Sequence, residues 1–301
     1  MSVAFVFPGQ GAQYVGMGLS LYESFANVKH LFDTAAKVLG QDFLQICFRG
    51  PDEFLTQTKI CQPALFLHGC VAVSILRDRD PNIHCDVAFG LSLGELTALW
   101  AAGVFDFETG LHIVSMRGKL MQEACEKTQG AMLCVIGGTD DDLKSLCDET
   151  NIEIANLNCP GQVVLSGSLE NIQLARELAA RMSFKRAMLL NVAGAYHSRL
   201  MESARDGFEK FIKNIEFSAP NMKVLSNVTG DLVSDPKDIK QKLVEQIVSP
   251  VLFEKCCHKA IEIGVNKFLE CGPGKSLAGL IRRIDKTLVT DNFDKSVDFN
   301  C

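Results

Sequence analysis

The sequence predicts an α/β fold, with a largely parallel sheet that carries helices on its faces and a smaller inserted unit. Three observations indicate this fold. A continuous apolar run at 3–7 ends in a glycine-rich turn and is followed by helical patterning. Strand, turn and helix recur in that order at 86–102 and at 265–284. Between these segments, from about 125 to 195, the chain follows a different pattern.

Each element of the predicted core follows from its local composition. The run at 3–7 is apolar throughout, as expected of a strand covered on both faces. The mostly apolar segment 62–76 predicts a buried helix with Pro63 in its first turn, where proline is tolerated. The remaining core elements are strands at 86–89, 222–227 and 265–270 and helices at 95–102, 198–213 and 276–284.

The inserted unit has its own order of elements. They are a strand at 131–136, a helix at 140–147, strands at 152–156 and 163–166, a helix at 169–182 and a strand at 186–192. This β-α-β-β-α-β order is typical of a ferredoxin-like unit. We therefore expect a core formed by 1–124 and 196–301, with a ferredoxin-like subdomain inserted at 125–195.

Composition narrows the classes of function. Of the 301 residues, 47% are hydrophobic and 22% are charged, and the formal net charge is −6. No basic block runs through the chain, so a nucleic acid is not expected as a partner. The first strand has no secretory signal before it, and no uninterrupted apolar run is long enough to span a membrane. These features favour a cytoplasmic protein.

The cysteines indicate a reducing compartment. No C-x-x-C pair and no Cys/His spacing typical of zinc occurs, so we expect no metal site. Most cysteines lie inside apolar segments, and we interpret them as small buried hydrophobic residues. The twelve are Cys47, Cys61, Cys70, Cys85, Cys125, Cys134, Cys147, Cys159, Cys256, Cys257, Cys271 and Cys301.

The segment Gly-Leu-Ser-Leu-Gly at 90–94 fits the pattern G-x-S-x-G. In this pattern the serine lies on a sharp strand-to-helix turn, and glycines flank it because larger side chains would clash. Ser92 is therefore a candidate nucleophile, and the amide that follows it could stabilise an oxyanion. An ordinary turn with a capping serine also fits, but the apolar strand before it and the apolar helix after it favour the nucleophile.

A serine nucleophile needs a base, and the chain has six histidines. His197 follows the last strand of the inserted unit, at the start of a predicted helix. Sites commonly form at such junctions between subdomains and at strand ends. This position favours His197 as the base, although a histidine in a loop can also have a purely structural role.

Two further features leave alternatives open. The glycine-rich segment 7–13 lacks the Gly-Lys-Ser/Thr ending of a phosphate loop and the third glycine of a dinucleotide-binding turn. It is either a tight turn or a loop that offers a backbone amide to an oxyanion. Arg117 lies between apolar residues of a predicted helix, so it either reaches the surface or serves as a fixed cation for a carboxylate.

Together, these segments resemble the malonyl-CoA:acyl carrier protein transacylases and the acyltransferase domains of fatty-acid and polyketide synthases. The likeness covers nearly the whole chain, in the family's order. It rests on F-V-F-P-G-Q-G-A-Q at 5–13, Q-P-A at 62–64, G-L-S-L-G-E at 90–95, M-R-G-K-L-M-Q-E-A at 116–124, N-x-N-C-P-G-Q-V-V at 156–164, the histidine at 197 and G-P-G-K at 272–275.

The resemblance implies an α/β-hydrolase-like core and a role for each matching residue. Ser92 would be the acylated nucleophile, and His197 its general base and acid. Arg117 would bind the free carboxylate of the malonyl unit. The backbone amides of Gln10 and Leu93 would form the oxyanion hole.

Other matching positions would support these residues. The backbone carbonyl of Gln246 would orient the histidine, and Asn158 would lie beside the site. The chain departs from the family at Leu91, where a histidine is usual, and a contact of that histidine with the acyl group would be lost. Tyr196, before the base, is a bulky residue that suits an unbranched malonyl group.

The implied reaction is the transfer of a malonyl group from malonyl-CoA to the phosphopantetheine thiol of an acyl carrier protein. It would pass through an acyl-enzyme in a ping-pong sequence and supply extender units for fatty-acid synthesis. No metal or redox cofactor is needed, and we expect a monomer without a membrane partner. Two alternatives remain: a serine thioesterase or esterase, and a non-catalytic module that binds a carrier protein.

Overall fold

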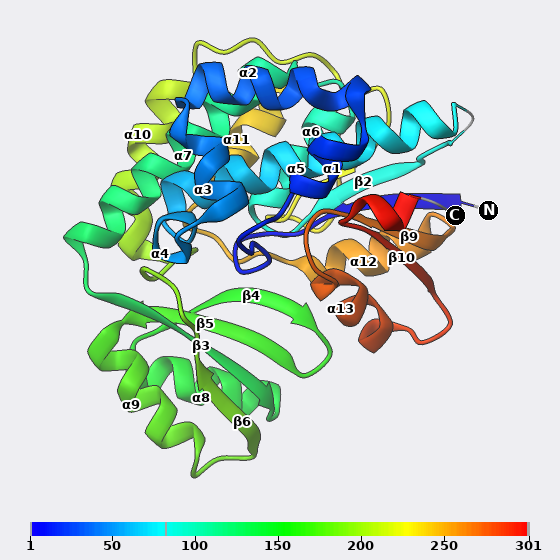
Figure 1. The fold of residues 1–301 in the computed structure, drawn as a ribbon. Helices are drawn as coiled ribbons and strands as arrows, with labels where there is room; N and C mark the ends of the chain where they lie inside the picture. Colours follow the sequence, from blue (N-terminus) through cyan, green and yellow to red (C-terminus); the bar gives the residue numbers. More distant parts are fainter. Residues whose placement is uncertain (1, 82, 300–301) are drawn as a thin grey trace.

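Two β-sheets of different kinds organise the chain (Figure 1). The computed structural model describes residues 2–81 and 83–299, so the predicted reduced Cys301 lies outside the described residues. One sheet has six strands and the other has four. The expected α/β class, with a largely parallel sheet and an inserted ferredoxin-like unit, is confirmed.

The larger sheet has the strand order β10-β9-β1-β2-β7-β8. All neighbouring pairs are parallel except β7 with β8. The strands are β1 (Ser2–Phe7), β2 (Val87–Gly90), β7 (Lys223–Leu225), β8 (Leu232–Val233), β9 (Val265–Cys271) and β10 (Val289–Phe293). The apolar run of β1 is covered on both faces as predicted, because Phe5 and Val6 belong to separate buried clusters.

Helices cover both faces of this sheet. Phe5 packs in one cluster with α5, α6 and α7, and Val6 packs in the other with α12 and α13. The helices of the core are α1 (Leu19–Ser24), α2 (Lys29–Leu39), α3 (Asp42–Arg49), α4 (Asp52–Leu55), α5 (Thr58–Arg79), α6 (Leu93–Ala101), α7 (Phe107–Lys127), α10 (Glu202–Ile212), α11 (Pro236–Gln246), α12 (Phe253–Glu262) and α13 (Ser276–Ile284). Short 3-10 helices are η1 (Ala26–Val28), η2 (Arg199–Met201) and η3 (Ser296–Phe299).

Helix α5 is the predicted buried helix, but it is longer than expected. It begins at Thr58, so the placement of Pro63 in its first turn was wrong and the proline lies inside the helix. By length and composition alone α5 could cross a membrane, yet 83% of its apolar window is buried within the protein. It is the central core helix, in contact with α6 and α7.

The four-stranded sheet is antiparallel, with the order β4-β5-β3-β6. Its elements are β3 (Gly130–Gly137), α8 (Asp140–Thr150), β4 (Glu153–Cys159), β5 (Gln162–Ser168), α9 (Leu169–Ala179) and β6 (Phe184–Leu189). A separate apolar cluster, with Leu133, Leu146 and Ile172, joins the sheet to both helices. The domain boundaries at 124/125 and 195/196 stay a prediction, and α7 runs on to Lys127.

Backbone hydrogen bonds join the inserted unit to the core. The Leu157 amide of β4 donates to the Val251 carbonyl at 2.9 Å, and the Val251 amide donates to the Ala155 carbonyl at 2.8 Å. This link holds β4 next to the segment between α11 and α12. Gln10 and Ser92, which follow the carboxyl ends of β1 and β2, line one pocket together with Asn158 of β4 and Val164 of β5. The carboxyl ends of parallel strands are where ligands commonly bind in α/β proteins.

Candidate active site

Ser92 lies at the sharp turn between β2 and α6. Its backbone has φ 54° and ψ −101°, a conformation that a serine rarely adopts. A Cβ atom on Gly90 would lie 2.3 Å from the carbonyl carbon of Gly94, and one on Gly94 would lie 2.0 Å from the Phe7 carbonyl oxygen. The flanking glycines are therefore required by close backbone packing, which holds the serine at the end of the strand.

His197 contacts the serine through a hydrogen bond of 2.8 Å between its Nε2 and Ser92 Oγ. Its Nδ1 lies 2.8 Å from the backbone carbonyl oxygen of Gln246. Because a carbonyl can only accept, Nδ1 of the neutral ring carries the proton and Nε2 can accept the serine proton. Burial, together with the charge of Arg117, lowers the pKa of His197 to about 4. The ring is thus a neutral base at neutral pH.

Arg117 is buried on α7, with 1% of its surface exposed. Its Nη1 donates to Gln62 Oε1 at 2.8 Å, and its Nη2 donates to Ser92 Oγ at 3.1 Å. Among the described residues, no carboxylate lies within ion-pair distance of the guanidinium. Burial lowers the pKa of Arg117 to about 10, which still leaves it charged at neutral pH. The site therefore holds a buried cation without a direct acidic partner, beside a serine and its base.

Gln246, at the end of α11, joins these groups. Its backbone carbonyl binds His197, and its side-chain Oε1 accepts from Arg117 Nη2 at 2.8 Å. Its Nε2 donates to the backbone carbonyl of Ser92 at 3.1 Å. The expected contact of the Gln246 carbonyl with the histidine is present, and the side chain contributes contacts that the sequence did not indicate.

The site opens into a pocket of about 180 Å³ between the core and the inserted unit. Its lining residues come from both parts of the chain: Gln10, Gln62, Leu91, Ser92, Leu93, Met121, Met132, Asn156, Asn158, Val164, Leu190, Val192, Tyr196 and His197. All the predicted site residues except Arg117 and Gln246 therefore line this pocket. Arg117 and Gln246 are not among the lining residues, but each donates a hydrogen bond to Ser92.

Three further residues of the pocket, Leu93, Tyr196 and Asn158, carry hydrogen-bonding groups. Leu93 is the first residue of α6, and amides at a helix start have no intrahelical acceptor. The Tyr196 hydroxyl lies 2.5 Å from Thr58 Oγ1 and accepts from Gln10 Nε2 at 3.3 Å. Asn158 Oδ1 is buried, with no hydrogen-bond partner among the described residues. An amide group in this position can accept a hydrogen bond from a ligand.

Comparisons with known proteins show the family to which this chain belongs. The model of the acyl transferase domain family matches residues 4–290. The chain belongs to this family. It is 40% identical over 294 residues to the malonyl CoA-acyl carrier protein transacylase of Bacillus subtilis, covering 96% of this chain and 92% of that protein.

Solved structures of acyltransferases have the same fold. An acyl carrier protein S-malonyltransferase from Vibrio cholerae superposes with a TM-score of 0.94 and 38% identity, covering 100% of this chain and 99% of that one. A malonyl-transacylase in complex with a type II polyketide synthase acyl carrier protein superposes with a TM-score of 0.95 and 34% identity. That comparison covers 99% of this chain and 98% of the other.

Sequence reasoning missed two residues of this acyltransferase site. Asn227 Oδ1 accepts from the Ser92 amide at 2.7 Å, and its Nδ2 donates to the Gly90 carbonyl at 2.8 Å. The carboxylate oxygen Oε2 of Glu95 accepts a hydrogen bond from the backbone amide of Asn227 at 2.9 Å. The position of Asn227 at the end of the predicted strand 222–227 was a usable signal, because polar residues at strand ends often form sites.

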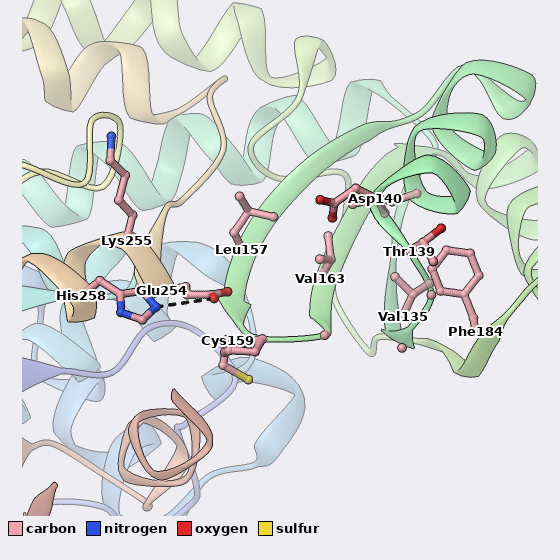
Figure 2. A pocket seen from close by; sticks show the side chains of 15 residues that line it. Val135, Thr139, Asp140, Leu157, Cys159, Val163, Phe184, Glu254, Lys255 and His258 are labelled. Atoms are coloured by element: carbon pink, nitrogen blue, oxygen red, sulfur yellow. Dashed lines mark ion pairs between the residues drawn. The ribbon is translucent and has the colours of Figure 1, made fainter. Parts of the chain in front are cut away.

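A second, larger hollow of about 480 Å³ lies between α12 and the inserted unit (Figure 2). Its wall on α12 includes Glu254 and His258, whose Oε1 and Nε2 atoms lie 3.8 Å apart. Its lining contains neither Ser92 nor His197. It therefore lacks the candidate nucleophile and the candidate base that line the first pocket.

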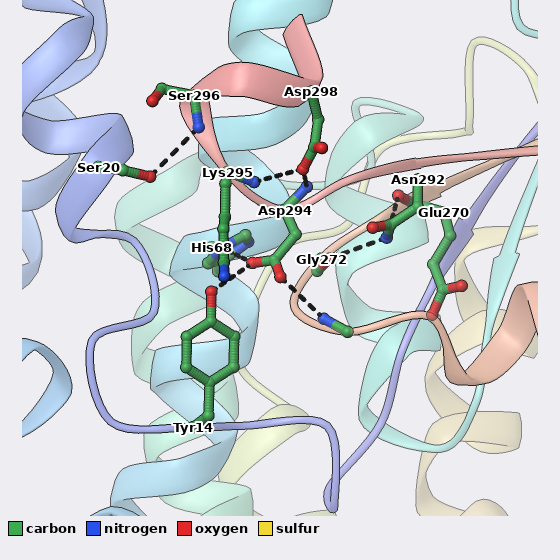
Figure 3. A network of polar contacts seen from close by, with 11 residues as sticks. Tyr14, Ser20, His68, Glu270, Gly272, Asn292, Asp294, Lys295, Ser296 and Asp298 are labelled. Carbon is green, nitrogen blue, oxygen red and sulfur yellow. Dashed lines mark hydrogen bonds and ion pairs between the residues drawn. The ribbon is translucent and has the colours of Figure 1, made fainter.

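The loop that carries Gln10 is anchored by a polar network (Figure 3). Tyr14 donates to Asp294 Oδ1 at 2.9 Å, and the same oxygen lies 3.3 Å from His68 Nε2 on α5. Burial opposes ionisation of Asp294, but the nearby His68 and the hydrogen bonds from the Gly274 amide and the Tyr14 hydroxyl outweigh it and lower the pKa of that carboxyl. The network ties the loop after β1 to α5 and to the segment after β10.

Proposed function

We propose that the protein transfers a malonyl group from malonyl-CoA to the phosphopantetheine thiol of an acyl carrier protein. The observation that carries this proposal is the buried guanidinium of Arg117, 3.1 Å from Ser92 Oγ and without an acidic partner in contact among the described residues. A carboxylate is the bidentate partner that such a cation favours. The printed names of the relatives, malonyl transacylases and malonyltransferases, support the same donor.

In the first half-reaction, Ser92 Oγ attacks the thioester carbonyl carbon while His197 Nε2 takes the hydroxyl proton. A tetrahedral intermediate forms, and its oxyanion accepts hydrogen bonds from the backbone amides of Gln10 and Leu93. Each such donor can contribute about 10²–10³ in rate. The C–S bond then breaks, and coenzyme A leaves as a thiol with the proton from His197. The product is a malonyl ester on Ser92.

The second half-reaction runs the same steps in reverse order. The thiol of the carrier protein's phosphopantetheine loses its proton to His197 as its sulfur attacks the ester carbonyl. The new C–S bond forms, the C–O bond to Ser92 breaks, and His197 returns the proton to the serine oxygen. The enzyme is restored, and the chemistry balances with protons alone, so we propose no metal or redox cofactor.

Arg117 selects the acyl group in both halves. It pairs with the free carboxylate of malonyl, while an acetyl group would leave the buried cation unpaired. Sites built to pair a polar group discriminate strongly against analogues that lack it. Leu91, Asn158 and Tyr196 form the pocket wall around the acyl group.

The setting of the enzyme is also part of the proposal. We infer a monomer that works in the cytoplasm and supplies extender units for fatty-acid synthesis. The cysteines support the cytoplasmic location, since those among the described residues are free and nearly all of them are buried. Such usage is typical of reducing compartments.

Intact-mass analysis after brief exposure to malonyl-CoA tests the proposal, with Ser92→Ala beside the wild type. We expect a malonyl adduct on the wild type only, and its transfer to an added carrier protein in the thiol form. Release of free coenzyme A without a stable adduct or transfer would instead favour a thioesterase. Neither adduct nor release would favour the non-catalytic binding module.

A further inference from the structure

Glu95 is a buried carboxyl group directly behind the nucleophile. It lies on α6, three residues after Ser92, and 1% of its surface is exposed. Its Oε2 accepts hydrogen bonds from the backbone amide of Asn227 at 2.9 Å and from the side-chain Nε2 of Gln246 at 2.6 Å. Among the described residues, no lysine or arginine lies within ion-pair distance of it. Such a group in a core usually has a direct charged partner.

The amide of Gln246 separates Glu95 from Arg117. Its Oε1 accepts from Arg117 Nη2 at 2.8 Å, while its Nε2 donates to Glu95 Oε2 at 2.6 Å. The amide therefore has a buried cation at one end and a buried carboxyl at the other. Charges at this separation interact strongly in a protein interior, where the effective dielectric constant is low.

Few other ionisable groups face Glu95. On α12, Cys256 is a buried thiol whose pKa is raised by burial, so it is neutral. His197 is also neutral, since its pKa is lowered to about 4. The segment after β7 and the end of α11 present the uncharged Asn227 and Gln246. Arg117, on α7, is thus the charge that acts on this carboxyl near neutral pH.

Burial raises the pKa of Glu95 to about 7, and the hydrogen bonds from Asn227 and Gln246 and the charge of Arg117 only partly oppose it. Both the ionised and the protonated forms are therefore populated near neutral pH. A malonyl carboxylate paired with Arg117 would add a second anion on the other side of the same cation. The two anions would compete for one positive charge.

We propose that Glu95 is a positioning residue that takes up a proton when the malonyl carboxylate pairs with Arg117, so that its charge tunes malonyl binding. This inference rests on the proposed malonyl transfer. The proton comes from solvent, and no bond to carbon and no electron is involved. Because coupling is reciprocal, ionised Glu95 must weaken malonyl binding by the same factor by which bound malonyl disfavours ionisation.

The first test compares malonyl with acetyl as the donated group. The ratio of kcat/KM for malonyl-CoA to that for acetyl-CoA is measured from pH 6 to pH 8. For the wild type we expect this ratio to fall by roughly fivefold or more as pH rises. Effects on His197 or on coenzyme A itself cancel, because both donors share them.

Two variants assign the effect to Glu95. Glu95→Gln keeps the size and an acceptor oxygen for Asn227 and Gln246 but cannot ionise, so its ratio should change by less than about twofold. Glu270→Gln is the matched control, a carboxyl 1% exposed that caps α13 through the Leu277 and Ala278 amides. For Glu270→Gln, the slope of the malonyl-to-acetyl ratio against pH should equal that of the wild type. A Glu95→Gln slope equal to that of the wild type overturns the inference.

A second measurement needs no variant and so does not depend on how Glu95→Gln folds. Wild-type enzyme in weak buffer at pH 7 is mixed with a stoichiometric amount of either donor, and proton uptake is followed with an indicator dye. We expect a fraction of a proton taken up per malonyl adduct and none per acetyl adduct. Equal uptake with both donors, on an enzyme that forms the malonyl adduct, overturns this inference alone. Absence of a malonyl adduct overturns the proposed function and this inference with it.

Discussion

The guanidinium Nη2 of Arg117 lies 3.1 Å from the Oγ atom of Ser92. The Nε2 atom of His197 lies 2.8 Å from the same serine oxygen, so the cation and the proposed base both contact Ser92 Oγ. We expect an acyl group on Ser92 to lie close to Arg117. A short diacid suits this arrangement, because its carboxylate can pair with the guanidinium while its carbonyl carbon stays at the serine. This relationship gives the first prediction.

Arg117→Ala should lower kcat/KM for malonyl transfer by about 10³-fold and that for acetyl transfer by no more than about tenfold. The reason is that only the malonyl group loses its charged partner. Arg117→Lys should fall between, since it keeps the charge but loses the planar fork that binds a carboxylate at two points. Steady-state rates with both donors check this, and equal losses for both would refute the assigned role.

His197 should give the enzyme an unusually acidic lower pH limit. The neutral ring is the proposed base, and burial lowers its pKa to about 4. With acetyl-CoA as donor, kcat/KM should change less than about twofold between pH 5.5 and pH 7, because this parameter reports the free enzyme. A fall centred near pH 6.5, the value of an ordinary histidine, would contradict the burial of the ring.

The same histidine should make folding depend on pH. Its pKa is lower in the folded chain than in the unfolded chain, so the unfolded state binds more protons between those values. Its contribution to the free energy of unfolding is thus fully present above about pH 6.5 and is lost as pH falls towards 4. Denaturant titrations at several pH values should show a shallower decline on acidification for His197→Gln than for the wild type.

Asn227 should matter as much for stability as for rate. Its side chain binds the backbone amide of Ser92 and the backbone carbonyl of Gly90, and Asn227→Ala would leave both groups unpaired. Each unpaired group costs about 1–3 kcal/mol, and the displaced serine should lower malonylation about 10- to 100-fold. Urea denaturation and malonylation rates measure the two effects. The exposed Asn214 provides a control, since Asn214→Ala should change neither.

Much of the fold could be predicted because β1 and β2 are largely apolar and each ends at a glycine-containing turn. The edge strand β10 could not, since its sequence Val-Thr-Asp-Asn-Phe has no apolar alternation. It is a strand because β9 pairs with it in parallel register. The helices α1 to α4 were likewise anticipated only as general helical patterning after the first turn.

The candidate site also contains residues that the sequence predicts and residues that it does not. Ser92 and His197 could be predicted because each lies at a turn or junction with a local signature. The end of a predicted strand marked Asn227 as a polar candidate, but its contact with Ser92 and the contacts of Glu95 could not be predicted. These contacts join residues far apart in the chain, 135 residues apart for the hydrogen bond from Ser92 to Asn227. Only the folded arrangement of β2, α6 and the end of β7 brings these groups together.

The last prediction concerns the turn itself. Gly94→Ala should prevent folding or destabilise the protein by more than about 3 kcal/mol, because its Cβ would lie 2.0 Å from the backbone oxygen of Phe7. That oxygen belongs to the central strand β1 and cannot move without disturbing the sheet. Gly279→Ala is the matched control: it lies within α13, its Cβ would meet nothing within 4 Å, and it should stabilise the protein by up to about 1 kcal/mol. Thermal denaturation of both variants separates the two effects. If Gly94→Ala folded with wild-type stability, the close packing of α6 against β1 would have to be wrong, and with it the position of the nucleophile.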